Sequence, residues 1–394
     1  MEVDYENLKS HIFLRYGKSI KYYYECELVS QHIQECTKEY ISPQTLRRIL
    51  GFIKSETNPS RRTLDLISNY CGYNNFSELN ENVIQKKHQQ YNNETISFIK
   101  EFYNIKPSEL NDINYQKACG NIAKKLTNDE KLLKNLSVYL SKNTTSQIYF
   151  YERYPFIDGI RKAYLNSFKM YSQQKKTNES IIFSHSIIFL AAFLGNDEKN
   201  MITALNTINK VSEKEIHPFP LARKIMSNIL FSNYKNDNNK LEKWKLTAFE
   251  TEKTLPRGNN IGVHFPYFQF IMSECFILIE DFESAFKMME IADIDYKKYN
   301  DGNIEDGYYE CFDILKAYTY MLAGNKNIAK RILNKVENHK IIFIAQNYYL
   351  IFRKIIELKL CKNSLSTKAI NIKSELKLLI EKTDFLYFKK YLTN

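Results

Sequence analysis

The stretch Ser42-Pro43-Gln44-Thr45-Leu46-Arg47-Arg48-Ile49-Leu50-Gly51 has the signals of a short helix at both ends. Ser42 is a preferred N-cap, because its hydroxyl can accept a hydrogen bond from a free backbone N–H group of the first turn. Pro43 suits the first helical position, where a backbone N–H group would have no helical partner. Gly51 lies near the expected exit, where a left-handed residue commonly follows a helix. The stretch therefore predicts a helix over residues 43–50.

This short helix has two chemically different faces. At 100° per residue, one stripe is apolar and should pack against a core; it consists of Leu46, Ile49, Leu50 and Ile53. The opposite side carries Gln44, Thr45, Arg47 and Arg48. Arg can bind guanine through two hydrogen bonds, Gln can do the same with adenine, and Thr can contact a phosphate or a thymine methyl group. The front of the helix is therefore suited to contacts with DNA.

Helices are predicted on both sides of this one. Residues 25–36 repeat side chains at the i, i+3, i+4 and i+7 positions of one helical face, and a short break over residues 37–41 follows. A third helix begins after Ser60, a second N-cap, and ends near Gly72. Its first residues, Arg61 and Arg62, oppose the local helix dipole, and a phosphate partner would explain them.

The order of these elements resembles Cro/C1-type helix-turn-helix domains, in the form common in Bacteroidetes regulators. The resemblance rests on Ser-Pro-x-Thr-Leu-Arg-Arg at 42–48, Pro-Ser-x-x-Thr-Leu-Asp at 59–65 and Tyr-x-Gly-Tyr at 70–73; the turn before Ser42 is longer than in the family and lacks Gly. It implies that the helix over residues 43–50 enters the major groove of double-stranded DNA and that the next helix begins near the backbone. By resemblance, the candidate base or phosphate contacts are Gln44, Thr45, Arg47 and Arg48, and the candidate phosphate contacts are Lys54, Arg61 and Arg62.

Basic charge is concentrated in the same region. The chain holds 56 Lys and Arg against 45 Asp and Glu, a net charge of +11. An AT-rich genome favours Lys codons, so Arg is the more informative residue, and four of the 11 Arg fall within sixteen positions. Residues 41–64 carry five basic side chains and one acidic side chain, a local balance that favours phosphate binding. The alternative is a solvated surface helix that binds no nucleic acid.

Several protein classes are not expected. The seven Cys are scattered without zinc-ligand spacing, which indicates reduced, mostly buried thiols of a cytoplasmic protein and no metal site. The N-terminus lacks the basic and apolar regions of a signal peptide. The most apolar stretch, residues 181–194, is shorter than the roughly 20 residues of a membrane span, so it predicts a buried core helix. Phosphate-loop, zinc-protease, serine-hydrolase and kinase motifs are missing, so neither an enzyme nor a cofactor is predicted.

The remaining residues continue as helices joined by short turns. Turns at Gly195, Asp281 and Gly324 are separated by 86 and 43 residues, and turns near Asn238 and Asn363 fit the same period. A period near 43 suits stacked helix pairs of an α-solenoid. The units resemble tetratricopeptide repeats, although they are longer than the 34 residues of that family and lack its full consensus.

The predicted fold class is all-α, with an N-terminal helix-turn-helix domain followed by an α-solenoid of tetratricopeptide-like helix pairs. The expected domains are a DNA-binding head over residues 1–82, a polar linker over residues 83–95 and a helical-repeat domain over residues 96–394. Aromatic clusters such as residues 149–151 and 265–268 could line a groove in the repeat domain, but packing is the favoured interpretation.

The leading functional hypothesis is a cytoplasmic, sequence-specific DNA-binding transcriptional regulator. The head would bind DNA as a homodimer, because one such head contacts too little DNA for tight binding. The repeat domain would mediate dimerisation, bind an effector, or both. This layout resembles quorum-sensing regulators that join such a head to a peptide receptor, so the effector could be a peptide or protein. The alternative is a helical-repeat scaffold for protein interactions that does not bind DNA.

Overall fold

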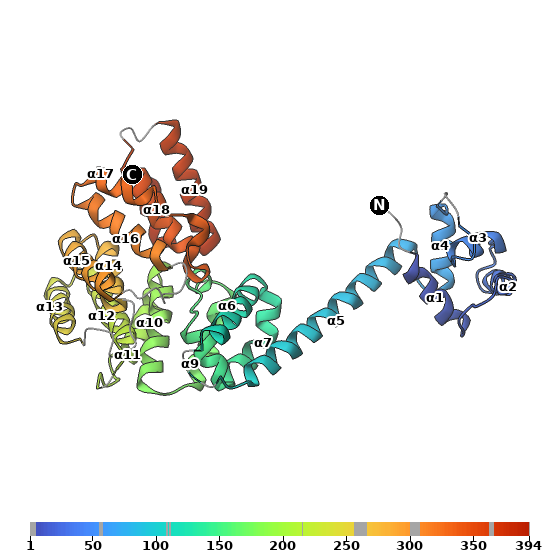
Figure 1. Cartoon of the computed structure of the whole chain (residues 1–394), viewed down its shortest axis with the longest axis horizontal. Coiled ribbons are helices and arrows are strands. Elements are labelled where there is room, and N and C mark those ends of the chain that lie inside the picture. The colour runs from blue at the N-terminus through green and yellow to red at the C-terminus, as the bar shows by residue number, and fades with distance from the viewer. Residues whose placement is uncertain are drawn as a thin grey trace. The chain divides into compact units, whose positions relative to one another are not determined.

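The computed structural model describes residues 5–54, 58–107, 109, 112–214, 216–255, 266–299, 308–361 and 366–393. In this part of the chain the fold is all-helical without any strand, as predicted. The chain divides into two compact units, Met1–Phe98 and Ile99–Asn394 (Figure 1). We refer to them as the head and the body.

The head contains the three helices that the sequence predicts, α2 (Glu25–Thr37), α3 (Pro43–Ile49) and α4 (Arg61–Tyr70), and two further helices, α1 (Glu6–Tyr16) and the first part of α5 (Phe76–Asn104). The Ser42 hydroxyl accepts a hydrogen bond from the N–H of Thr45 at 3.1 Å, and Ser60 accepts one from Thr63 at 3.2 Å. Beyond the ends of α3 and α4, Gly51 and Gly72 adopt φ angles of 82° and 92°. Local capping chemistry therefore fixes both helices, as expected.

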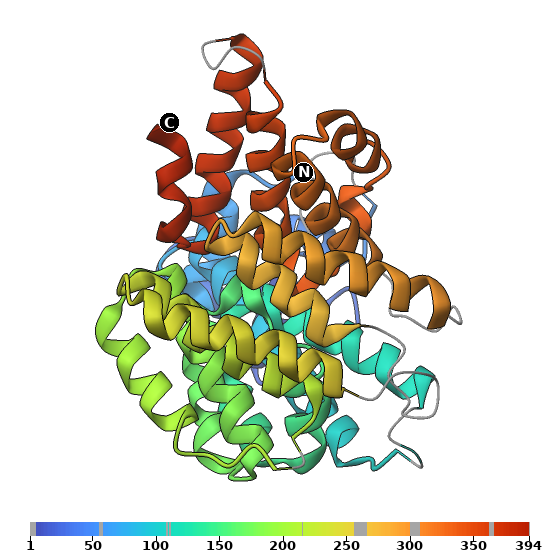
Figure 2. The ribbon, with the colours of Figure 1, turned by 90° about the vertical axis from the view of Figure 1, so that its left-hand side faces the viewer.

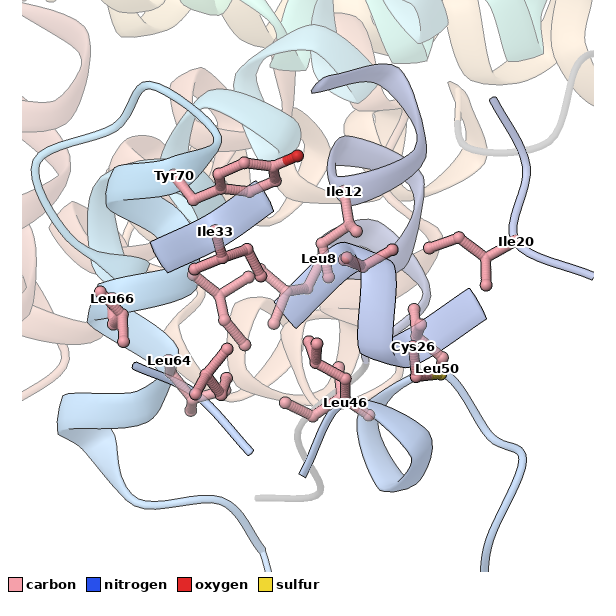
Figure 3. Close-up of a cluster of buried hydrophobic side chains, with 14 of the residues drawn as sticks. Leu8, Ile12, Ile20, Cys26, Ile33, Leu46, Leu50, Leu64, Leu66 and Tyr70 are labelled. Atoms are coloured by element: carbon pink, nitrogen blue, oxygen red, sulfur yellow. The ribbon is translucent and has the colours of Figure 1, made fainter. Parts of the chain in front are cut away.

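Apolar side chains of α1 to α4 form one small core. Leu46, Ile49 and Leu50 are each less than 5% exposed, and Ile53 is half-buried, so the apolar stripe predicted for α3 faces inward. Figure 3 shows Leu46 of α3 converging with side chains of the other helices, among them Leu8, Ile12, Ile33 and Leu64. Because this core holds the back of α3, the front of the helix is turned outward.

Helix α5 includes residues that the sequence assigns to a linker. Residues 83–95 lie within α5, and the division between the two units falls after Phe98, later than the predicted end of the head at residue 82. The run contains three Gln and two Lys, which are good helix formers as well as common linker residues. Polarity alone does not distinguish a solvated helix from a linker.

The body begins with a helical segment that precedes a series of helix pairs. This segment comprises α6 (Ile113–Asn128), α7 (Glu130–Lys142), α8 (Thr144–Ser146), η1 (Gln147–Glu152), η2 (Ile157–Gly159) and α9 (Ala163–Gln174). The first helices of the pairs are α10 (Asn178–Leu194), α12 (Pro218–Tyr234), α14 (Tyr267–Leu278), α16 (Tyr308–Leu322) and α18 (Gln346–Lys359). The second helices are α11 (Glu198–Ile208), α13 (Asn238–Thr254), α15 (Phe282–Tyr299), α17 (Lys326–Leu333) and α19 (Thr367–Thr383).

The helix pairs follow one another in space as in the sequence. Each first helix packs on its own second helix, and the first helices contact in the order α10, α12, α14, α16, α18 (Figure 2). Successive second helices begin 40, 44, 44 and 41 residues apart. Each second helix buries at least one Ala, whose small side chain permits close packing; these are Ala204, Ala248, Ala285 with Ala292, Ala329 and Ala369.

Four of the turns between paired helices share one backbone conformation. The residues with positive φ are Asn196 (56°), Asn236 (54°), Glu280 (61°) and Gly324 (84°). In the first three turns the next residue is an Asp whose carboxylate caps the following helix. The turns predicted at Gly195, near Asn238, at Asp281 and at Gly324 are therefore present. The turn predicted near Asn363 lies outside the described residues.

The last helix pair contacts the segment that precedes α9. Asp158 of η2 is 5% exposed and accepts hydrogen bonds from the backbone N–H groups of Asn347 and Tyr348 at 2.7 and 2.9 Å. Arg161 forms an ion pair with Asp384, directly after α19, at 2.9 Å. The segment before the helix pairs and the last helix pair are thereby joined by side chains far apart in the sequence.

The final residues of the chain pack on the same series. These residues form η6 (Leu386–Lys389) and α20 (Lys390–Thr393). The Tyr387 ring lies 4.7 Å from that of Phe193, and the Phe388 ring lies 5.6 Å from that of Phe352, measured between ring centroids. Such contacts account for the many aromatic residues of the body.

The predicted roles of several other residues can be compared with the structure. The rings of residues 149–151 are at most 2% exposed, and Phe268 is 1% exposed, so these described members of the aromatic clusters belong to the core, while Phe265 lies outside the described residues. The stretch 181–194 falls within the largely buried helix α10, as predicted. None of the seven cysteines, all of which lie in the described residues, forms a disulfide; four are buried and Cys36 is exposed. In the described part of the chain no helix is long and apolar enough to cross a membrane.

Candidate nucleic-acid interface

Gln44 and Arg48 form the outward face of α3. Both side chains are exposed, and they lie one helical turn apart on the same side. Among the residues that the structure describes, neither side chain has a hydrogen-bond or ion-pair partner. An amide and a guanidinium at this spacing can each present two hydrogen-bonding groups to a flat base edge.

Arg47 and Thr45, the other two candidates on α3, are engaged within the head. The guanidinium of Arg47 lies over the ring of Tyr23, with its central carbon 3.7 Å from the ring centroid. It also donates to a carboxylate oxygen of Glu27 at 2.9 Å, and its side chain is only 11% exposed. The Thr45 hydroxyl lies 2.8 Å from that of Ser42, beside the N-cap. These two residues therefore contribute first to the local structure of α3.

The three remaining candidates are the first two residues of α4 and Lys54, which precedes it in the sequence. Lys54, Arg61 and Arg62 are all exposed. Arg62 approaches Glu39 at 3.4 Å, but both side chains are more than half exposed, so this ion pair is screened by water and weak. Arg61 is the first residue of α4, where the positive end of the helix dipole adds to the charge of its side chain. An anion such as a phosphate would be attracted to this position.

A buried carboxylate holds the chain that leads into α2. Glu25 accepts hydrogen bonds from the backbone N–H groups of Lys21 and Tyr22 at 2.8 and 2.9 Å, and it pairs with Lys18 at 2.9 Å. These donors lower the pKa of Glu25 to about 2, with the hydrogen bond from Lys18 as the largest cause. Glu25 therefore remains ionised at neutral pH and fixes the residues on either side of Tyr23.

Sequence reasoning did not identify Tyr23 and Glu27 as part of this region. Both precede Arg47 by at least twenty residues, so their contact with Arg47 depends on how α2 and α3 pack. The run Tyr22-Tyr23-Tyr24 is the one available signal, because three consecutive aromatic residues directly before a helix are unusual. In the structure the rings of Tyr22 and Tyr24 stack at 5.7 Å and both are more than half exposed.

A buried polar cluster of the body centres on Glu274. Glu274 is fully buried and accepts hydrogen bonds from the hydroxyls of Tyr348 and Tyr349 at 3.0 and 3.1 Å, and Arg223 lies 3.4 Å away. Burial raises the pKa of both tyrosines, so they act as neutral donors. The cluster joins α12, α14 and α18, which gives it a structural role. Within the described residues no group of His, Cys, Asp and Glu side chains could hold a metal ion.

Comparison of the chain with protein-family models, with curated proteins and with solved structures finds no match.

Proposed function

We propose that this chain is a sequence-specific DNA-binding transcriptional regulator, in which α2 and α3 act as a helix-turn-helix. The observation that carries the proposal is the pair Gln44 and Arg48, which are exposed on a helix whose opposite face is buried in the core of the head. A short helix held in this way can enter the major groove of double-stranded DNA, which admits one α-helix. Its two free polar side chains then face the base edges.

In this arrangement, different residues carry affinity and specificity. Arg48 would donate two hydrogen bonds to a guanine, and Gln44 would bond an adenine. Lys54, Arg61 and Arg62 would bind phosphates, which supplies affinity for any sequence and fixes the orientation of the head. Arg61 and Arg62 begin α4, so the free N–H groups and dipole of that helix would act on the same phosphate.

The body would provide the second half of a regulator. A single head of this size buries too little surface for tight specific binding, so we propose that the chain binds as a homodimer. The five successive helix pairs of the body support a tetratricopeptide-like solenoid, an architecture that offers extended surfaces for proteins and peptides. Dimerisation, effector binding, or both would then be functions of the body.

The test is selection of bound sequences by the full-length protein. The purified chain is incubated with a pool of random duplex DNA at two salt concentrations, and the retained duplexes are sequenced over several rounds. We expect a motif to be enriched at both salt concentrations, with total binding falling as salt rises. Retention without a motif, or no retention, would contradict the proposal and favour a helical-repeat scaffold for protein interactions.

A further inference from the structure

Arg47 differs from its neighbour Arg48 in every contact that it makes. The Arg47 side chain is 11% exposed, whereas Arg48 is exposed. One flat face of the Arg47 guanidinium covers the Tyr23 ring, while its edge donates to the Tyr23 carbonyl at 3.3 Å and to Glu27 at 2.9 Å. Three groups at the start of α2 are therefore bound by a single side chain of α3.

These contacts require a guanidinium rather than a positive charge alone. A planar guanidinium can stack on a ring through its face and donate hydrogen bonds from its edge at the same time, and an ammonium group cannot. The Tyr23 backbone is itself fixed, since the neighbouring residue Tyr22 donates its N–H to the buried carboxylate of Glu25. Arg47 thus links α3 to a rigid part of the head.

The same contacts remove Arg47 from the surface that Gln44 and Arg48 present. To reach a base edge, Arg47 would have to leave the Tyr23 ring and the Glu27 carboxylate together. Gln44 and Arg48 have no such contacts to give up among the described residues. We infer that Arg47 is a positioning residue, which holds α3 against the start of α2, and that Gln44 and Arg48 read the bases. This inference rests on the proposed function.

The first test measures the position of α3 without DNA. Hydrogen–deuterium exchange of α3 is followed in the full-length chain and in the variants Arg47→Ala, Arg47→Lys, Tyr23→Leu and the double variant Arg47→Ala/Tyr23→Leu. We expect exchange in α3 to become about fivefold faster in Arg47→Ala and Arg47→Lys, and less so in Tyr23→Leu, which removes only the ring contact. The double variant should exchange no faster than Arg47→Ala, because the ring contact is already lost with the guanidinium. Arg48→Ala is the matched control and should leave the exchange unchanged.

The second test measures base preference with the same variants. If Arg47 positions α3, Arg47→Ala weakens binding to all sequences and retains the enriched motif, and Arg47→Lys does not restore affinity. A phosphate contact would be partly restored by Arg47→Lys. A change of motif in Arg47→Ala, together with unchanged exchange in α3, would overturn the inference. If the unmodified chain enriches no motif, the proposed function fails, and the exchange experiment alone decides whether Arg47 holds α3.

Discussion

The backbone N–H of Tyr348 donates a hydrogen bond to the carboxylate of Asp158, which lies 190 residues earlier in the chain. Asn347 adds two further donors to the same carboxylate, from its backbone and from its side-chain amide. Asp158 thus acts as an N-cap at the start of α18, although it lies in η2, which precedes the helix pairs. The body is therefore closed by long-range contacts in addition to the packing of successive helix pairs.

Closure through Asp158 predicts a pH-dependent stability of the body. Burial raises the pKa of Asp158 to about 6, although its three donors act in the opposite direction. The pKa of Asp158 in the folded chain lies above the ordinary value of 3.8, so between pH 3.8 and about 6 the folded chain binds a proton that the unfolded chain does not. The stability that protonation of Asp158 contributes is present at low pH and is lost as the pH rises through about 6. We expect the stability of the wild type relative to Asp158→Asn to increase by about 1 kcal/mol from pH 7.5 to pH 5.

The measurement is urea unfolding of both chains at several pH values. Only the difference between the two chains is used, because other groups titrate in the same range. A difference that stays constant between pH 7.5 and pH 5 would show that Asp158 has an ordinary pKa.

The ion pair between Arg161 and Asp384 can be tested through a glycine. A Cβ atom on Gly195 would lie 2.2 Å from the central guanidinium carbon of Arg161. We expect Gly195→Ala to displace Arg161 from Asp384 and, because the pair is partly exposed, to lower the free energy of unfolding by about 1 kcal/mol. In the Arg161→Ala background the same change should cost much less, because the obstructing group is absent. Equal costs in both backgrounds, measured by urea unfolding, would contradict this arrangement.

Glu25 predicts the opposite pH dependence in the head. Its pKa is lowered to about 2 by Lys18 and two backbone N–H groups, so its contribution to stability is present above pH 4.5 and is lost as the pH falls toward 2. We expect exchange in α2 to be faster in Glu25→Gln than in the wild type at pH 7. The ratio of the exchange rate in Glu25→Gln to that in the wild type should decrease as the pH is lowered from 4.5 to 3, when both are corrected for the intrinsic exchange rate. A ratio that does not change over this range would argue against ionic capping by Glu25.

The phosphate contacts predict a change in salt dependence. If Arg61 and Arg62 each neutralise one phosphate, each single Ala variant should reduce the slope of log affinity against log salt by about 1, for all DNA sequences alike. Lys326→Ala is a matched control, because Lys326 is also an exposed basic residue at the start of a helix, but in the body. An unchanged slope in both Arg variants would show that residues other than Arg61 and Arg62 bind the DNA phosphates.

The features that the sequence predicted well depend on neighbouring residues. Ser42 and Gly51 mark the ends of α3 within the chain segment itself, and the turns between helix pairs repeat a left-handed residue near a capping Asp. Such signals need no knowledge of the tertiary structure. The bounds of α2, α3 and α4 and most turns of the body could therefore be predicted.

The features that were not predicted depend on packing. On a helical wheel Arg47 and Arg48 are equivalent polar residues, and only the position of α2 brings Tyr23 and Glu27 to Arg47. In the same way, nothing near Asp158 in the sequence indicates that α18 begins beside it. The polar run over residues 83–95 was ambiguous for another reason, because the residues that favour a solvated helix also favour a linker.

The central claim, that Gln44 and Arg48 read DNA, is tested most directly by sequence selection with a matched variant. The full-length wild type and the Gln44→Ala/Arg48→Ala double variant are compared on the same random duplex pool, after hydrogen exchange has shown that α3 is equally protected in both. We predict that the wild type enriches a motif containing guanine and adenine positions, and that the double variant loses the preference at these positions, with a loss of about 1–3 kcal/mol for each contact. Enrichment of an identical motif by both chains, or of no motif by the wild type, would contradict the account.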